Sequence, residues 1–330
     1  MPSRRLRALP LAALLVAACQ SDKAKVDPEA LHDMHVGTAL AHYDLGDMPR
    51  ALDQAQRALE IEPDDKAMLL LGGWCYMRMG STQDLVQAQS IFLGVEKKFP
   101  DDLRAKLGTA KTSERLALIN EQTAKDVESG KRLPVGATVA DEVTRLRKES
   151  KRLYGMAEDR YRMLVETKSE NIEALNGMVR ITGLTGRPEE SLTYAGRLIE
   201  ELDKQRVFYA RQLERREMQP SEEQSYRKLE RDATTLLIDT RELAANLHFD
   251  LGRPSLALAH LDAAIELDPK DRPDLYAQRA QVYMALDSPA RALEDLDLFI
   301  ARSTLPVEHP EVQKAWQMRR DARTALALKP

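Results

Sequence analysis

Near the start of the chain, side chains that can bind a metal gather within one helical stretch: His32, Asp33, His35 and His42. Imidazole and carboxylate groups are ligands of zinc and related metals, so this group raises the hypothesis of a metal site. The position of His42 recurs in later stretches of similar sequence, however, and packing side chains stand there: Tyr76, His248 and Tyr283. We therefore interpret these histidines as packing residues and predict no bound metal.

The sequence contains no recognisable pattern of catalytic or cofactor-binding residues. GxSxG, phosphate-binding-loop, HExxH, CxxC and EF-hand patterns are all missing. None of the six histidines can be combined with a nucleophile and an orienting acid into a catalytic triad. Cys75 stands mid-helix at a position for small residues, where we expect a buried, inert thiol. We predict a protein that is not an enzyme and holds no cofactor.

The other cysteine, Cys19, follows a short apolar segment. Three arginines, Arg4, Arg5 and Arg7, precede the uncharged stretch ALPLAALLVAA. A basic start, a short apolar segment and small residues before a cleavage point make up a secretory signal. The apolar stretch is shorter than the roughly 20 residues that span a bilayer. We therefore expect residues 1–18 to be a signal peptide.

The sequence Val16-Ala17-Ala18-Cys19 resembles the lipobox of bacterial lipoproteins, with valine where leucine is commonest. The resemblance implies that the Cys19 thiol receives a diacylglyceryl group, that the chain is cut before it, and that the new amine is acylated, as with palmitate. Several acyl chains on one residue anchor a protein stably. Gln20 stands where inner-membrane lipoproteins of the enteric type carry aspartate, so the resemblance implies the outer membrane, with residues 19–29 as lipidated cysteine and tether. The alternative is a secreted protein with a coincidental cysteine.

The composition narrows the class of partner. The chain has 330 residues, of which 43% are hydrophobic and 31% charged. Alanine, leucine, glutamate and arginine are abundant, which favours helices over strands. The formal net charge of −4 creates no basic field, so we expect no nucleic acid as a partner.

One segment of the chain occurs twice. LGDMPRALDQAQRALEIEPDD (45–65) recurs as LGRPSLALAHLDAAIELDPKD (251–271). A glycine, two alanines and a proline keep the same spacing in both: Gly46, Ala51, Ala58 and Pro63, then Gly252, Ala257, Ala264 and Pro269. This pattern resembles the tetratricopeptide repeat, a helix–turn–helix unit of about 34 residues. The resemblance implies an all-α fold, a right-handed solenoid in which each helical hairpin buries its apolar face against its neighbours.

Weaker copies of this unit occupy most of the remaining chain. In this frame residues 30–306 hold about six repeats, with long insertions within 112–156 and 205–237. Residues 307–330 hold an amphipathic helix that suits a solenoid cap. Small residues on the two helices of each copy face one another and let the backbones approach: Ala39, Gly73, Gly108, Ala245 and Ala280 on first helices, and Ala51, Ala88, Ala157, Ala257 and Ala292 on second helices.

Helix-forming sequence in the middle of the chain is longer than a repeat requires. Two pairs of arms are interrupted at GKRLPVGATV (130–139) and at MQPSEE (218–223). Each arm of about 30 residues would be ~45 Å long. We predict two elongated helical hairpins that project from the solenoid. Positive charges on the first of them suit either an acidic partner or lipid headgroups, or simply a solvated helix face: Arg145, Arg147, Lys148, Lys151 and Arg152.

In the repeat family, the first helix of each pair lines a concave groove that binds a partner. The N-terminal part of this implied groove is apolar and aromatic, with Trp74 at its centre. Such a surface suits an amphipathic helix or an extended apolar segment. The lysine and asparagine pattern of chaperone-binding members is absent. The resemblance implies these groove residues: Val36, Leu40, Tyr43, Leu70, Trp74, Met77, Arg78, Asn176, Arg180, Asn246, Phe249 and Met284.

Together these features predict a non-catalytic lipoprotein that is anchored in the outer membrane and faces the periplasm. We expect it to bind protein partners as a scaffold or assembly factor of an envelope complex, without a small-molecule substrate. Such complexes serve pili and secretion, outer-membrane assembly or polysaccharide export, and the fold alone does not choose between them. An alternative is a regulatory subunit of a periplasmic cell-wall enzyme complex.

Overall fold

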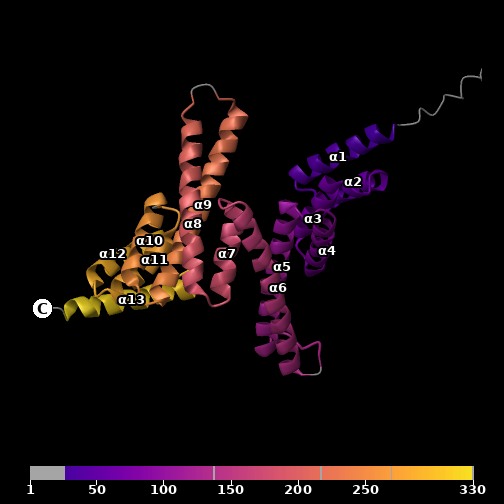
Figure 1. Cartoon of the computed structure of the whole chain (residues 1–330). Helices are drawn as coiled ribbons and strands as arrows, with labels where there is room; N and C mark the ends of the chain where they lie inside the picture. The colour runs from indigo at the N-terminus through magenta and orange to yellow at the C-terminus, as the bar shows by residue number, and fades with distance from the viewer. Residues whose placement is uncertain (1–26, 137, 216–217, 269, 329–330) are drawn as a thin grey trace, which may run out of the picture. The chain divides into compact units, whose positions relative to one another are not determined.

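The computed structural model describes residues 27–136, 138–215, 218–268 and 270–328. The expected signal peptide and Cys19 lie outside the described residues. Within these ranges the chain forms thirteen α-helices and no strand (Figure 1), which confirms the all-α class. Among the helices so described, none combines the length and the apolar character that crossing a membrane requires.

The described residues pack as two compact units, and the division falls within α5 (Leu103–Glu128), after Thr112. The first unit contains two helical hairpins and the start of α5. Its helices are α1 (Pro28–Asp44), α2 (Met48–Ile61), α3 (Lys66–Met79) and α4 (Thr82–Lys98).

The second unit continues with helices that each pack on the next one along the chain. These are α6 (Val139–Thr167), α7 (Ile172–Leu184), α8 (Pro188–Leu213), α9 (Pro220–Asp250), α10 (Pro254–Leu267), α11 (Pro273–Ala285), α12 (Pro289–Arg302) and α13 (Pro310–Ala327). The last helix, α13, packs on α12 and α11 and buries Val312, Ala315 and Ala322, as expected of a closing helix. Its Trp316 packs against the same core, with the Arg319 guanidinium 5.3 Å from the ring centroid.

The repeated glycine ends the first helix of a hairpin. Gly46 and Gly252 have φ angles of 82° and 72°, a left-handed conformation that glycine adopts without strain. In the next copy, Leu286-Asp287-Ser288-Pro289 replaces Leu251-Gly252-Arg253-Pro254. Asp287 takes a φ of 53° there, since aspartate tolerates this region better than most residues. The same turn therefore forms even where the glycine is missing.

Small residues bring the paired helices together, as the sequence predicted. All ten of the alanines and glycines expected to face one another are buried. Aromatic rings of second helices fill the space that the glycines leave: a Cβ on Gly108 would lie 2.4 Å from the Phe92 ring, and one on Gly177 would lie 2.4 Å from Tyr161. These glycines are therefore part of the packing.

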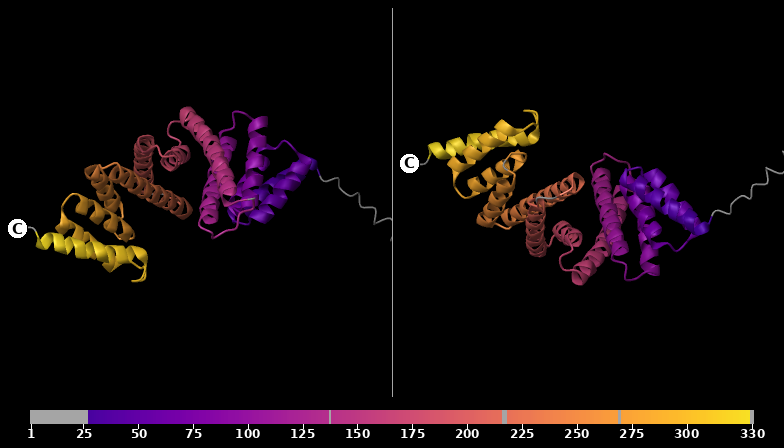
Figure 2. Two further views of the ribbon diagram at one scale, coloured as in Figure 1. Left: turned by 90° about the horizontal axis from the view of Figure 1, so that it is seen from below. Right: turned by 90° about the horizontal axis from the view of Figure 1, so that it is seen from above.

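Two elongated helical hairpins are present, as expected, and they are α5–α6 and α8–α9. The helices α5 and α6 have 26 and 29 residues, and α8 and α9 have 26 and 31. The helices α8 and α9 pack on each other, and Figure 1 shows them extending past α10, whereas Figure 2 views the hairpin from its two ends. Along the first hairpin most of the predicted positive charges are in ion pairs: Arg145 with Glu142, Arg147 with Glu128 and Arg152 with Glu149, at 2.6–2.8 Å. These ion pairs favour the solvated helix face over a basic patch for an acidic partner.

Candidate functional site

The histidines of α1 make contacts between helices of the first unit. His32 Nε2 lies 3.1 Å from Asp65 Oδ2, and His35 Nδ1 lies 2.8 Å from Gln54 Oε1. No group of three or more histidine, cysteine or acidic side chains within the described ranges could hold a metal. Cys75 is fully buried, and this burial raises the pKa of its thiol to about 11, although Arg78 partly opposes the effect. The thiol is therefore protonated at neutral pH and inert.

The groove residues predicted in the first unit lie on α1 and α3. Val36 and Tyr43 pack against the core of α1–α3, and the Arg78 guanidinium lies 4.8 Å from the centroid of the Tyr43 ring. Arg78 also donates a hydrogen bond to the Tyr43 carbonyl at 3.1 Å. Leu40 is exposed. The structure thus joins Tyr43 and Arg78 on this face.

Trp74 packs edge-on against Phe92, with ring centroids 4.9 Å apart. It is half-buried, together with Met77, on the core that α3 forms with α4 and α5. Leu70 is buried inside that core, so its assignment to a binding groove is corrected. The reason is packing: Leu70 belongs to the buried cluster with Phe92 and Ala105, whereas Trp74, one turn further along the same helix face, is only partly buried against it.

The predicted residues of the second unit fall into two groups. Phe249 and Met284 pack partly buried against the core of α9–α13, and Asn176 is half-buried on α7. Arg180 and Asn246, by contrast, line one cavity together. That cavity, the groove cavity, has a volume of about 630 Å³ and lies between α5, α7 and α9. Its lining residues are Glu114, Leu118, Arg180, Gly183, Leu184, Asp239, Glu242, Leu243, Asn246 and Leu247.

A buried ion pair fixes one wall of the groove cavity. Arg180 donates two hydrogen bonds to the Glu114 carboxylate, at 2.5 and 2.7 Å, and the Tyr161 hydroxyl donates a third at 2.8 Å. Burial, followed by the charge of Glu114, raises the pKa of the Tyr161 hydroxyl. Burial disfavours the charge on Arg180, but its bonds to Glu114 outweigh this and raise its pKa. Arg180 is therefore held as a charged, oriented group.

The acidic side of the groove cavity is held by Arg272, which precedes α11, and by Gln278 of α11. Arg272 donates hydrogen bonds to Asp239, at 2.8 Å, and to Glu242. Glu242 also accepts a hydrogen bond from the Gln278 amide at 2.5 Å. Asn246 has no hydrogen bond from its side chain within the described part of the chain, so its amide is available to a ligand.

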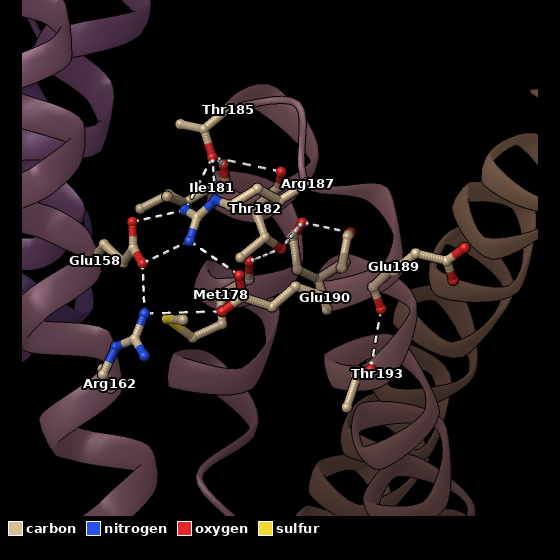
Figure 3. Close-up of polar contacts among 12 residues, drawn as sticks. Glu158, Arg162, Met178, Ile181, Thr182, Thr185, Arg187, Glu189, Glu190 and Thr193 are labelled. Atoms are coloured by element: carbon tan, nitrogen blue, oxygen red, sulfur yellow. Dashed lines mark hydrogen bonds and ion pairs between the residues drawn. The ribbon is translucent and has the colours of Figure 1, made fainter. Parts of the chain in front are cut away.

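A second cavity, also of about 630 Å³, shares Leu118 and Leu184 with the groove cavity. We call it the lysine cavity, and its other lining residues are Glu121, Gln122, Lys125, Lys151, Tyr154, Gly155, Glu158, Thr185 and Arg187. Figure 3 shows how Arg187 is held there, with two hydrogen bonds to Glu158 at 2.7 and 2.9 Å and one to Glu190 at 2.9 Å. Lys125 and Lys151 line this cavity, are exposed, and form no ion pair among the described residues.

Sequence reasoning found Arg180 and Asn246 but missed the leucines and carboxylates around them. Helical spacing was the available signal: Leu184 follows Arg180 by one turn, and Asp239, Glu242, Leu243 and Asn246 form a single stripe on α9. Glu114 and Leu118 gave no such signal, because they lie on α5 within the range 112–156 that holds the long insertion.

Comparison with known proteins identifies the repeat. The sequence profile of the tetratricopeptide repeat matches residues 36–84 and 243–305. No curated protein matches the chain. A thermophilic TPR protein from Thermus thermophilus is 15% identical, with a TM-score of 0.45, over 77% of this chain and 99% of its own. YrrB, described as a TPR protein with an unusual peptide-binding site, is 15% identical, with a TM-score of 0.49, over 80% of this chain and 97% of its own.

A tetratricopeptide repeat protein from Parabacteroides merdae is 16% identical, with a TM-score of 0.37, over 88% of this chain and 99% of its own. Repeats of this family are in general modules that bind peptides or proteins and do not catalyse reactions. The profile matches fall on α1–α4 and on α9–α12, where the glycine turns and the facing small residues occur. Residues 36–84 and 243–305 therefore match the tetratricopeptide repeat, and the same helical-hairpin fold continues through the helices between them.

Proposed function

We propose that the protein is a scaffold that holds a partner by a segment lying in the groove cavity. The observation that carries this proposal is a set of four leucines around one open cavity: Leu118, Leu184, Leu243 and Leu247. Leu118 and Leu184 are 40% and 54% exposed. A partner side chain placed among them removes this apolar surface from water, and burying one leucine-sized side chain contributes about 1.5–3 kcal/mol.

The polar groups of the two cavities specify the chemistry of that segment. Asp239 and Glu242 accept hydrogen bonds, so they favour donors or cations on the partner. The Asn246 amide can bond to the backbone of a helical or extended segment. In the adjoining lysine cavity, the ammonium groups of Lys125 and Lys151 favour a carboxylate on the partner segment. The expected partner segment therefore has an apolar centre, an acidic residue on one side and a donor or cation on the other.

Replacing Leu184 by aspartate tests this site. We expect peptides selected on the wild-type chain from a random displayed library to bind the Leu184→Asp variant about tenfold or more weakly, because the change removes apolar contact and adds a carboxylate beside Glu114 and Glu242. Fluorescence polarisation of the selected peptides measures the difference. Circular dichroism should stay unchanged, since Leu184 is exposed at the end of α7.

The matched control is Leu256→Asp, which places the same charge at a comparably exposed leucine on α10, outside both cavities. Selected peptides should bind this variant as they bind the wild-type chain. If no peptide is enriched on the wild-type chain, or if enriched peptides bind Leu184→Asp undiminished, the groove cavity is not the binding site.

We further propose that this scaffold is attached to the periplasmic face of the outer membrane through a lipidated Cys19, and that its partner belongs to an envelope complex. The support is the order of a basic start, a short apolar segment and Val-Ala-Ala-Cys within residues 1–19. Several acyl chains at Cys19 would hold the repeats at a membrane surface without a spanning helix.

Labelling with radioactive palmitate tests the anchor. The wild-type chain should incorporate label and sediment with membranes, whereas Cys19→Ala should incorporate none, because the thiol that starts lipid attachment is gone. Cys75→Ala is the control, since Cys75 is buried in the first unit, and it should label like the wild-type chain. Equal labelling of Cys19→Ala and wild type would show that Cys19 is not the attachment site.

A further inference from the structure

The loop at the end of the α5–α6 hairpin exposes two aliphatic side chains next to two cations. Leu133 is 85% exposed and Val135 is 82% exposed. Lys131 and Arg132 come directly before them, and residues 129–139 contain no acidic side chain. In Figure 1 this end of the hairpin extends past α7. The loop therefore presents a convex tip that is both apolar and basic.

Hydrogen bonds at Arg132 and Thr138 hold the loop on either side of Leu133 and Val135, while the four side chains stay exposed. The Arg132 amide donates a hydrogen bond to the Asp126 carbonyl at 3.0 Å, and Thr138 caps α6 by accepting from the Asp141 amide at 3.1 Å. Beneath the loop, α5 and α6 bury a small core of Ala124, Val127, Val143 and Leu146. Leu133 and Val135 are not members of that core, so the hairpin does not need them in order to fold.

The other long hairpin shows that the fold does not require an apolar tip. Between α8 and α9 the connecting sequence is Glu-Arg-Arg-Glu-Met-Gln, residues 214–219, which is almost entirely polar. Lys131 and Arg132 are exposed, and within the described residues neither makes an ion pair. The charge of Arg132 helps to lower the pKa of the Glu142 carboxyl, but Glu142 is bonded to Arg145, at 2.8 and 3.0 Å.

We propose that this tip docks on the surface of an anionic lipid bilayer. Leu133 and Val135 enter the boundary between headgroups and acyl chains, while Lys131 and Arg132 lie among the headgroup phosphates. Burial of apolar side chains and attraction of cations to anionic lipid act together at this depth of a membrane. A convex tip fits this soft surface directly, whereas a protein partner would need a socket of matching shape. The site is separate from the groove cavity and from Cys19.

Co-sedimentation with sucrose-loaded vesicles tests the proposal on the chain from Gln20 onward, which keeps every described residue. Vesicles of phosphatidylcholine with phosphatidylglycerol should bind this chain, and vesicles of phosphatidylcholine alone should bind it about tenfold more weakly. Leu133→Ser with Val135→Ser should lower binding to the anionic vesicles by about tenfold or more. Lys131→Ser with Arg132→Ser should reduce it to the level seen with phosphatidylcholine.

Leu45→Ser is the matched control, because Leu45 is 81% exposed in the turn after α1 but has Asp44 before it, Asp47 two residues after it, and no lysine or arginine next to it in the sequence. It should bind vesicles like the parent chain. A polarity-sensitive dye gives a second measurement: attached at Leu133→Cys its emission should shift to the blue on anionic vesicles, and at Leu45→Cys it should not. Cys75 stays unlabelled because its thiol is buried.

Two results would overturn the proposal. The first is that the parent chain binds neither kind of vesicle, which would show that this tip does not dock on a bilayer. Alternatively, it binds, but the variants at Leu133 and Val135 lose no more than Leu45→Ser does. Misfolding does not confuse these outcomes, since all the substituted side chains are exposed and thermal unfolding followed by circular dichroism should be unchanged.

Discussion

Replacing Arg180 by methionine should lower the free energy of unfolding by about 3–5 kcal/mol, which is the usual cost of removing one partner of a buried ion pair. The Glu114 side chain is only 4% exposed, so the substitution leaves its charge buried with the Tyr161 hydroxyl as a remaining donor. Methionine keeps the length and most of the packing of the arginine stem, so the loss comes chiefly from the unpaired carboxylate. Urea unfolding followed by circular dichroism measures it.

The same pair predicts an asymmetry between its two members. The Arg180 side chain is 39% exposed and can reach water, whereas that of Glu114 cannot. Glu114→Gln should therefore cost less, about 1–2 kcal/mol, because the amide oxygen still accepts hydrogen bonds. The double variant Glu114→Leu with Arg180→Met should recover part of the loss, since it leaves no buried charge. A larger loss for Glu114→Gln than for Arg180→Met would contradict this description of the pair.

The second large effect is expected at Gly177, in the middle of α7. Alanine normally stabilises a helix interior by about 1 kcal/mol relative to glycine. Here the added Cβ would lie 2.4 Å from the ring of Tyr161, which is fully buried and whose hydroxyl is held by Glu114. The ring cannot move aside, so Gly177→Ala should destabilise the second unit by about 1–3 kcal/mol, as overpacking of a core does.

Gly196→Ala supplies the control for Gly177→Ala on the neighbouring helix α8. Nothing lies within 4 Å of a Cβ at Gly196, which is exposed. The same chemical change should therefore stabilise the chain there, by about 0.5–1 kcal/mol. If Gly177→Ala lowers the free energy of unfolding and Gly196→Ala raises it, the Tyr161 ring requires a glycine at position 177. Equal shifts in the thermal midpoint would show that only helix propensity is at work.

The sequence predicted the features of the fold that local spacing determines. Gly46 and Gly252 hold the same place in two copies of one segment, and this located the hairpin turns. The small residues identified which helix faces pack together. Both features depend on contacts within one repeat. The two long hairpins followed from uninterrupted helical sequence on either side of GKRLPVGATV and MQPSEE. The turns, the packed helix faces and the long helices were therefore predicted correctly, because each depends on residues that are close together in the sequence.

The binding site could be predicted only in part, for a physical reason. The Glu114–Arg180 pair joins residues 66 positions apart, and no periodic pattern relates them. Leu118 and Leu184 line the same cavity only because the long α5–α6 insertion returns the chain to the same side, and the sequence does not show how that insertion packs. Leu70 is an error of the opposite kind. Its position in the repeat predicted an exposed groove residue, but the side chain is buried in the core.

The chain contains two tryptophans, and each structural unit has one of them. Trp74 packs against Phe92 in the first unit, and Trp316 packs against the core of the second unit beside Arg319. The protein thus contains a native fluorophore for each unit, with no label needed. Variants with Trp74→Phe or Trp316→Phe let the emission of one unit be followed at a time. Coincident or separated transitions then reveal whether the two units unfold as one cooperative body or independently of each other.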